Sequence, residues 1–425
     1  MADRPTASIV GGGPAGLIAA EKLARDGFAV TVFEHKPSVG RKFLLAGRGG
    51  LNLTHTEPFD EFVAHYDATG WMAPLLATFG PDDLRAWSAG LGEDTFVGSS
   101  GRVFPASFRA TPLLRAWLRR LDELGVVFAT RHRWRGWGDE GAHRFAGPDG
   151  SEFDVVADAT VMALGGASWP RVGSDGGWVS VFESAGITVT SLRPANAGVV
   201  VDWSAAFAER FAGQPVKNVA VSVGGAAVDG DERSDVRGDV MVTTSGLEGG
   251  PVYAVGREVR AELDASGGCT LMIDLHPDQT VEQLTERLAK RRPKDSVTTW
   301  LRRSLGLHLV AVNLIREAVG ARLPADPGRM AELVKRVPLS IVGSMPIDRA
   351  ISTAGGVALD ELDGDLMLRR RPGTFVAGEM IDWEAPTGGY LLQASFSTGV
   401  VAARGASKWS RGGREPSRSL TDDDR

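Results

Sequence analysis

The fold is decided by residues 7–42, which read ASIVGGGPAGLIAAEKLARDGFAVTVFEHKPSVGRK. A short apolar run ends in Gly11-Gly12-Gly13-Pro14-Ala15-Gly16, which fits the pattern G-x-G-x-x-G. A helical pattern follows, with apolar residues at 17, 20, 23 and 24, and it stops at Gly27. A second β-rich run then ends at Glu34. The order of strand, glycine turn, helix, strand and acid predicts a Rossmann-like dinucleotide-binding unit.

The physical case for this motif concerns charge and space. The first turn of a helix offers free N–H groups and a positive dipole end, which stabilise a pyrophosphate. Side chains at Gly11 and Gly13 would obstruct the turn and the approach of the phosphates, and Gly16 lets helix and strand pack closely. Glu34 can accept hydrogen bonds from both ribose hydroxyls and would repel a 2′-phosphate. We therefore expect FAD or NAD rather than NADP at this site.

Composition narrows the class of protein. A chain of 425 residues is long enough for two or three domains, and its 43% hydrophobic content is ordinary for a globular protein. The net charge of −6 argues against a nucleic-acid partner. A single cysteine, Cys269, and seven scattered histidines predict no disulfide and no metal site. The N-terminus has no apolar signal segment and no run is long enough to span a bilayer, so we expect a cytoplasmic protein without a membrane partner.

Two later parts of the chain also have a glycine turn directly after a predicted strand. A buried strand over residues 157–164 runs into Gly165-Gly166, which could pass close to the same cofactor. A strand at 374–377 ends in Gly378-Glu379, and Gly388-Gly389 opens a long helix. Glu379 can bond a ribityl hydroxyl, and this helix can direct its dipole at the N1–C2 edge of a flavin. A second anchoring turn so far along the chain suits a cofactor as long as FAD and decides between FAD and NAD.

The middle of the chain has a different pattern of predicted secondary structure. Short β runs separated by Gly and Asp occupy residues 187–273, and a helical pattern follows to about residue 336. We predict an α/β protein whose Rossmann-like FAD-binding domain (residues 1–190 plus 346–405) is interrupted by a β-barrel domain (191–277 plus 337–345). The barrel carries a small helical insert (278–336), and residues 406–425 form a disordered tail.

Taken together, these motifs resemble the BaiN-like (YhiN-type) family of bacterial NAD(P)/FAD-dependent oxidoreductases, from about residue 8 to residue 403. The resemblance implies an FAD domain split by a β-barrel with a helical insert. Two departures suggest a distinct subgroup. The family's loop usually reads G-R-C-N, but the corresponding stretch here, Gly50-Leu51-Asn52, has no cysteine, which excludes thiol chemistry there. The family's G-G-Y-N motif ends here in Leu391. The motifs that carry the resemblance are 11–16 with Glu34, 40–42, 47–54, 104–105, 163–168 with Gly173 and Gly176, 354–357, 378–379 and 388–390.

The leading functional hypothesis is an FAD-dependent oxidoreductase that transfers hydride through flavin N5 to or from an unidentified small molecule. No second G-x-G-x-x-G follows a strand, so NAD(P)H would be a transient co-substrate or the substrate itself would reduce the flavin. A flavin monooxygenase and a non-catalytic flavin protein that senses redox state or associates with RNA remain alternatives. The oligomeric state is left open.

The predicted site residues fall into two groups. Catalytic candidates in motif loops are Arg48, Asn52, Glu248 and Tyr390. The predicted cofactor-binding residues are Gly11, Gly13, Pro14, Ala15, Gly16, Glu34, His35, Arg41, Lys42, Gly49, Asn52, Leu53, Ala163, Gly165, Gly166, Gly378, Glu379, Gly388, Gly389 and Tyr390.

Overall fold

The computed structural model describes residues 4–224 and 235–412. They divide into two compact units, residues 1–193 with 352–425 and residues 194–351. The boundaries between the two units lie a few residues beyond the predicted ones at 190 and 345. The reason is that β11 (Val189–Ala195) pairs with β19 (Ser352–Val357). The three-part division with a separate helical domain stays a prediction.

The first unit is built on a parallel sheet of five strands in the order β20-β10-β1-β2-β6. This confirms the predicted Rossmann-like α/β fold. Since the strands are parallel, the residues that follow β1, β2, β10 and β20 all lie at the carboxyl edge of the sheet, where ligands bind in this class of fold. The strands are β1 (Thr6–Val10), β2 (Ala29–Glu34), β6 (Val127–Thr130), β10 (Ala159–Met162) and β20 (Thr374–Val376).

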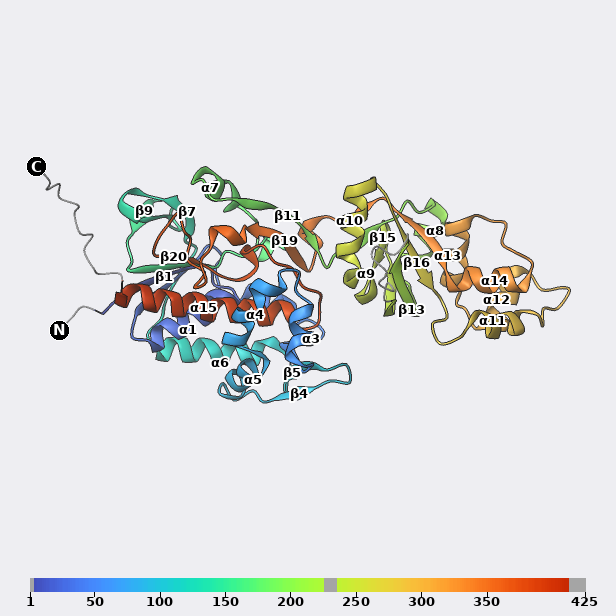
Figure 1. The fold of residues 1–425 in the computed structure, drawn as a ribbon, viewed down its shortest axis with the longest axis horizontal. Coiled ribbons are helices and arrows are strands. Elements are labelled where there is room, and N and C mark those ends of the chain that lie inside the picture. The colour runs from blue at the N-terminus through green and yellow to red at the C-terminus, as the bar shows by residue number, and fades with distance from the viewer. Residues whose placement is uncertain (1–3, 225–234, 413–425) are drawn as a thin grey trace, which may run out of the picture. The chain divides into compact units, whose positions relative to one another are not determined.

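Helices α1 (Pro14–Arg25) and α15 (Tyr390–Gly412) pack along each other (Figure 1). The predicted apolar face of α1, from Leu17 to Ala24, is buried in the core of this unit. The remaining elements here are α2 (Arg41–Ala46), β3 (Thr54–His55), α3 (Phe59–Ala64), α4 (Thr69–Thr78), α5 (Pro81–Ala89), β4 (Thr95–Val97), β5 (Arg102–Pro105), α6 (Ala110–Glu123), β7 (Arg133–Trp137), β8 (His143–Ala146), β9 (Glu152–Val155) and α7 (Val179–Ser184).

One boundary prediction is wrong. The predicted disordered tail begins at residue 406, but α15 continues to Gly412. The reason is packing, since Ala403 and Ala406 are fully buried and Ser407 donates to the Asp26 carboxylate (2.7 Å). The rest of the predicted tail, residues 413–425, lies outside the described part of the chain.

The second unit holds an antiparallel sheet in the order β17-β16-β13-β14-β15-β12-β18. The predicted β-barrel is not confirmed, because β17 and β18 stand at the two ends of this order and are not paired with each other. The two edge strands, β17 and β18, are consecutive in the chain and are separated only by Val342. The strands are β12 (Val199–Val200), β13 (Pro215–Val223), β14 (Val236–Val242), β15 (Gly246–Glu248), β16 (Cys269–Asp274), β17 (Val337–Ile341) and β18 (Gly343–Ser344).

The helices of the second unit share one hydrophobic core with its sheet. Leu284, Trp300, Leu314 and Val334 of the helical segment are completely buried in it. No helix in residues 4–224 and 235–412 is long and apolar enough to cross a bilayer. The helices are α8 (Ala205–Phe211), α9 (Gly250–Ala254), α10 (Gly256–Ser266), α11 (Val281–Leu288), α12 (Val297–Leu305), α13 (Leu309–Val319) and α14 (Pro327–Lys335).

Candidate active site

The first glycine turn is shaped by close backbone approaches. Gly11 has a φ of +109°, and a Cβ there would lie 2.2 Å from the carbonyl oxygen of Ala163. A Cβ on Gly16 would lie 2.0 Å from the oxygen of Gly11. Gly13 is different, since no atom of the described residues apart from Gly13 and its two chain neighbours lies within 4 Å of the Cβ position it lacks. The motif therefore has two glycines required by packing and one that leaves open space.

Helix α1 begins beside that open space. Gly13 is its N-cap without a side-chain cap, Pro14 occupies the first turn, and that turn holds no acidic residue. Free N–H groups and a positive dipole end therefore face the space in front of Gly13, as an anion site requires. Ala15 has a packing role as well, because its Cβ would lie 2.8 Å from a Cβ on Gly378 and its oxygen 2.5 Å from one on Gly399.

Glu34 lies at the end of β2, next to this turn. Its carboxylate accepts hydrogen bonds from the backbone N–H of Gly12 (3.0 Å) and of Lys36 (2.8 Å). Burial raises the pKa of Glu34, and the two N–H groups oppose that rise only in part. A carboxylate with remaining lone pairs at this position can accept further bonds from ligand hydroxyls.

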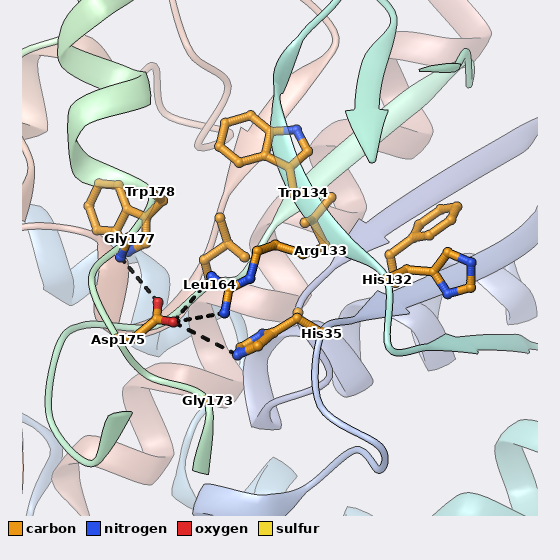
Figure 2. A pocket seen from close by; sticks show the side chains of 12 residues that line it. His35, His132, Arg133, Trp134, Leu164, Gly173, Asp175, Gly177 and Trp178 are labelled. Atoms are coloured by element: carbon orange, nitrogen blue, oxygen red, sulfur yellow. Dashed lines mark hydrogen bonds and ion pairs between the residues drawn. The ribbon is translucent and has the colours of Figure 1, made fainter. Parts of the chain in front are cut away.

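A pocket opens at the same edge of the sheet, beside Glu34 (Figure 2). His35, Arg133 and Asp175 face one another in it, and Trp134 and Trp178 contribute to its walls. Arg133 donates to Asp175 (3.2 Å), whose other oxygen accepts from the N–H of Gly177 (3.1 Å). The remaining lining residues are Val10, Gly11, Phe33, His132, Leu164, Gly173 and Gly177.

The surroundings of His35 and Asp175 decide the protonation states of these two side chains. Burial lowers the pKa of His35 to about 4, and the Arg133 guanidinium adds to that effect. Burial alone would raise the pKa of Asp175, but the Gly177 N–H and Arg133 hold it below its usual range. His35 is therefore neutral at pH 7, and its Nε2 is buried without a hydrogen-bond partner in the described structure.

We expect His35 to make the protein's stability depend on pH. The unfolded chain takes up a proton on this side chain below about pH 6.5, whereas the folded protein does so only near pH 4. The free energy of unfolding should therefore fall as the pH is lowered from 6.5 to 4, by about 1.4 kcal/mol per pH unit for this group. His35→Asn should reduce the slope of the free energy of unfolding against pH by that amount, measured in urea titrations at several pH values, while His143, whose pKa burial also lowers to about 4, keeps its own contribution. An unchanged slope would show that His35 titrates normally.

A second carboxylate, Glu379, lies in the short 3-10 turn Gly378–Met380 that follows β20. It accepts from Lys42 Nζ (2.5 Å) and from the backbone N–H of Thr353 (3.0 Å) and Gly166 (3.4 Å). Lys42 also donates to the hydroxyl of Ser168 (2.7 Å). The structure thus brings together three residues predicted from separate motifs, Lys42, Gly166 and Glu379.

Thr353 and Ser168 are members of this cluster that sequence reasoning missed. Thr353 Oγ1 accepts from the N–H of Ala167 (2.9 Å), which ties the second glycine turn to β19. A Cβ on Gly166 would lie 2.2 Å from that same hydroxyl. Ser168 is the last residue of the motif 163–168, and Thr353 directly precedes the motif 354–357. Their position beside the glycines of these motifs could have indicated that they belong to the site.

The third glycine turn, Gly388-Gly389, leads into α15. Gly389 has a φ of +105°, and a Cβ there would lie 2.6 Å from the backbone of Thr54. Across this contact, Asn52 Oδ1 and Thr54 Oγ1 are buried and have no hydrogen-bond partner within the described structure. Tyr390, the first residue of α15, is 5% exposed and donates its hydroxyl proton to Glu57 Oε1 (2.7 Å).

The other predicted residues have varied surroundings. Arg48 and Gly49 are exposed, whereas Leu53 is fully buried and its N–H donates to the Val103 oxygen (2.8 Å). Arg41 donates to Ser38 (3.3 Å) but keeps a buried Nε without a partner among the described residues. Glu248 belongs to the second compact unit, so its predicted role at the site stays a prediction. The roles of all these residues in binding remain proposals.

The parallel sheet, its glycine turns and the carboxylates at the end of β2 and after β20 are the features of the Rossmann class of α/β proteins, many of which bind dinucleotides. Residues 5–405 match the family described as the HI0933-like protein Rossmann domain, and the chain belongs to that family. It is thereby an oxidoreductase of a flavin-dependent family.

Two curated relatives span nearly the whole chain. A 3-dehydro-bile acid delta(4,6)-reductase of Clostridium scindens is 28% identical over 412 residues, which cover 94% of this chain and 98% of that protein. A ribosomal RNA dihydrouridine synthase of Haemophilus influenzae is 23% identical over 415 residues, with the same coverage. Among solved structures, 3-ketosteroid delta1-dehydrogenase of Sterolibacterium denitrificans has a TM-score of 0.51 at 14% identity, covering 95% of this chain and 99% of that one, and shows a shared fold.

Proposed function

We propose that this protein binds FAD along the carboxyl edge of the parallel sheet and reduces a carbon–carbon double bond conjugated to a carbonyl group in a small molecule. The observation that carries the cofactor assignment is the pair of carboxylates, Glu34 and Glu379, each placed beside a glycine turn of the same sheet. In this proposal the pyrophosphate faces Gly13 and α1, and Glu34 holds the adenosine ribose. The adenine would occupy the pocket beside His35.

The residues present fit FAD on independent grounds. Four of the buried polar atoms that have no hydrogen-bond partner in the described structure are His35 Nε2, Arg41 Nε, Asn52 Oδ1 and Thr54 Oγ1. Such atoms are rare in a native fold and indicate a missing ligand or water. A Cβ on Gly13 would have no atom of the described residues within 4 Å, its chain neighbours apart, which leaves room beside the helix start for a phosphate. Glu379 and Lys42 would lie along the ribityl and phosphate part, and the N-terminus of α15 would approach the flavin ring.

FAD, when bound, supplies an N5 atom that takes up and releases hydride, and no protein base is required for that step. The chain's own residues would hold the ring in place. The names of the two curated relatives support the substrate class, since a delta(4,6)-reductase and a dihydrouridine synthase both add hydrogen to a ring carbon–carbon double bond. NAD(P)H is proposed as the electron donor that visits the flavin transiently.

FAD binding has a direct test. The purified protein should absorb near 450 nm, or do so after reconstitution, and Glu34→Gln should weaken FAD binding by about 10- to 100-fold. The reason is that a neutral amide accepts ribose hydroxyl bonds less strongly than a carboxylate, by about 1.5–3 kcal/mol. Fluorescence titration of the apoprotein with FAD measures the change. Equal affinity of the two proteins for FAD would show that Glu34 does not bind the cofactor. A wild-type protein that does not bind FAD would overturn the proposed function.

The substrate class is tested by anaerobic screening. Protein reduced with dithionite is mixed with cyclohex-2-enone, a 4-en-3-one steroid and a bile acid carrying a 3-oxo-4,6-diene, and reoxidation of the flavin is followed by absorbance. Reoxidation with formation of the saturated product supports the proposal. Oxygen consumption coupled to a hydroxylated product would indicate a monooxygenase instead.

Ribosomal RNA is the second candidate substrate, favoured by the name of the Haemophilus influenzae relative. The net charge of −6 weighs against it. Incubation of the reduced protein with ribosomal RNA, followed by nucleoside analysis for dihydrouridine, separates the two candidates.

A further inference from the structure

Titratable side chains gather where α15 begins, outside the pocket of Figure 2. The Tyr390 hydroxyl donates to Glu57 Oε1 (2.7 Å), and Glu57 Oε2 lies 3.3 Å from His65 Nε2. Tyr390 is 5% exposed, whereas the His65 side chain is 41% exposed. These three side chains therefore form a continuous path of hydrogen bonds from the interior to the surface.

The path is fixed by its neighbours. The His55 ring stacks on Tyr390 with centroids 5.8 Å apart, and His55 Nδ1 accepts from the N–H of Glu57 (3.3 Å). His65 packs on the same ring at 4.5 Å. The hydroxyl of Tyr66 donates to the Tyr390 carbonyl (2.8 Å), which holds the first turn of α15 in place. Such contacts define one geometry for the Tyr390 phenol.

The electrostatics keep the phenol protonated. Burial raises the pKa of Tyr390, and its hydrogen bond to the Glu57 carboxylate and the charge of that group raise it further, against an opposing effect of Arg102. A phenol of this kind is neutral at pH 7. It can nonetheless protonate a strongly basic carbon, such as that of an enolate.

The inner end of the path adjoins the proposed flavin site. Tyr390 directly follows Gly388-Gly389, the turn that packs on the backbone of Thr54. Thr54 Oγ1 is one of the buried atoms without a partner in the described structure. The phenol and the atoms proposed to contact the flavin therefore belong to the same small region.

We infer that Tyr390, Glu57 and His65 form a proton relay that completes the reduction of a conjugated double bond, an inference that rests on the proposed function. Reduction adds a hydride from reduced FAD to the β carbon, which oxidises the FAD and leaves the substrate as an enolate. Tyr390 then protonates the α carbon as its O–H bond breaks. His65, protonated from solvent, then transfers a proton to the Glu57 carboxylate, and the resulting carboxylic acid passes it to the phenolate, so that Tyr390 is again a phenol and Glu57 again a carboxylate. In sum, one hydride and one solvent proton convert C=C to CH–CH.

The test separates proton transfer from electron transfer. Dithionite-reduced holoprotein is mixed anaerobically with cyclohex-2-enone, which needs a proton, or with ferricyanide, which takes electrons alone. Tyr390→Phe should slow reoxidation by the enone about 100- to 10,000-fold while ferricyanide reoxidation changes by less than about twofold. Glu57→Gln and the more exposed His65→Gln should shift the same ratio in the same direction, and the solvent deuterium isotope effect of the enone reaction should change.

The matched control is Tyr253→Phe, which removes a phenol hydroxyl from α9 of the second unit and leaves Tyr390, Glu57 and His65 unchanged. Its enone-to-ferricyanide ratio should equal that of the wild type. If Tyr390→Phe retains FAD and reduces the enone at the wild-type rate, or if both acceptors slow equally, the relay is overturned. If the wild-type protein reduces no enone but reacts with ferricyanide, the proposed function fails and the relay fails with it.

Discussion

Gly16→Ala is expected to lower the free energy of unfolding by about 3 kcal/mol, at the upper end of typical overpacking costs. The added Cβ would lie 2.0 Å from the backbone oxygen of Gly11, which cannot move aside as the end of a side chain can. Relief requires α1 to shift away from β1, and both elements are buried in the core. Urea denaturation of the two proteins measures the loss through the transition midpoint.

Gly13→Ala is the matched variant within the same motif. Apart from its chain neighbours, its Cβ meets no atom of the described residues within 4 Å, so the stability change should be less than about 1 kcal/mol, as for an N-cap substitution. The methyl group would instead enter the space proposed for the pyrophosphate, so FAD affinity should fall. If Gly13→Ala binds FAD as tightly as the wild type, the phosphates do not face Gly13. If Gly16→Ala is fully stable, the close packing of α1 on the turn is not required.

Glu21→Ala is expected to cost about 3–5 kcal/mol of folding free energy, because it leaves several buried donors without an acceptor. Glu21 is 3% exposed in α1 and accepts from the indole N–H of Trp87 (3.0 Å) and of Trp117 (2.9 Å). Its other oxygen accepts from Arg25 (2.9 Å) and Arg120 (3.2 Å). This one carboxylate therefore joins α1 to α5 and α6.

Arg25→Ala provides the comparison for that result. Its side chain is 50% exposed, so loss of its ion pair with Glu21 should cost less than about 1 kcal/mol. Urea unfolding of both variants, with far-UV circular dichroism as the signal, gives the two values. A cost for Glu21→Ala no larger than that for Arg25→Ala would mean that Trp87, Trp117 and Arg120 find other acceptors or water.

Local patterns in the chain were sufficient to predict the parallel sheet and its first glycine turn. The spacing of Gly11, Gly13 and Gly16 and the acid at Glu34 reflect contacts within one strand-turn-helix-strand unit, so a short window contains the whole signal. The same holds for Gly378-Glu379 and for the helix after Gly389. The family match over residues 5–405 agrees with that prediction.

Long-range contacts decided what the sequence could not show. Lys42, Ser168, Thr353 and Glu379 lie in four segments spread over more than 300 positions of the chain, and only the folded sheet joins them. The role of Glu21 was hidden for the same reason, since an acid on an amphipathic helix looks solvated until Trp87 and Trp117 are packed against it. Likewise, the continuation of α15 to Gly412 depends on partners far away in the sequence.

By itself, the sequence determined the dinucleotide-binding unit, because the turn, the dipole of α1 and the acid at Glu34 are fixed by neighbours in the chain. Only the tertiary structure decided which side chains share a site. It placed His35 beside Arg133 and Asp175, and it linked Tyr390 to Glu57 and His65. The physical reason is that pairing and burial of polar groups depend on distance in space, which sequence spacing does not encode beyond one supersecondary unit.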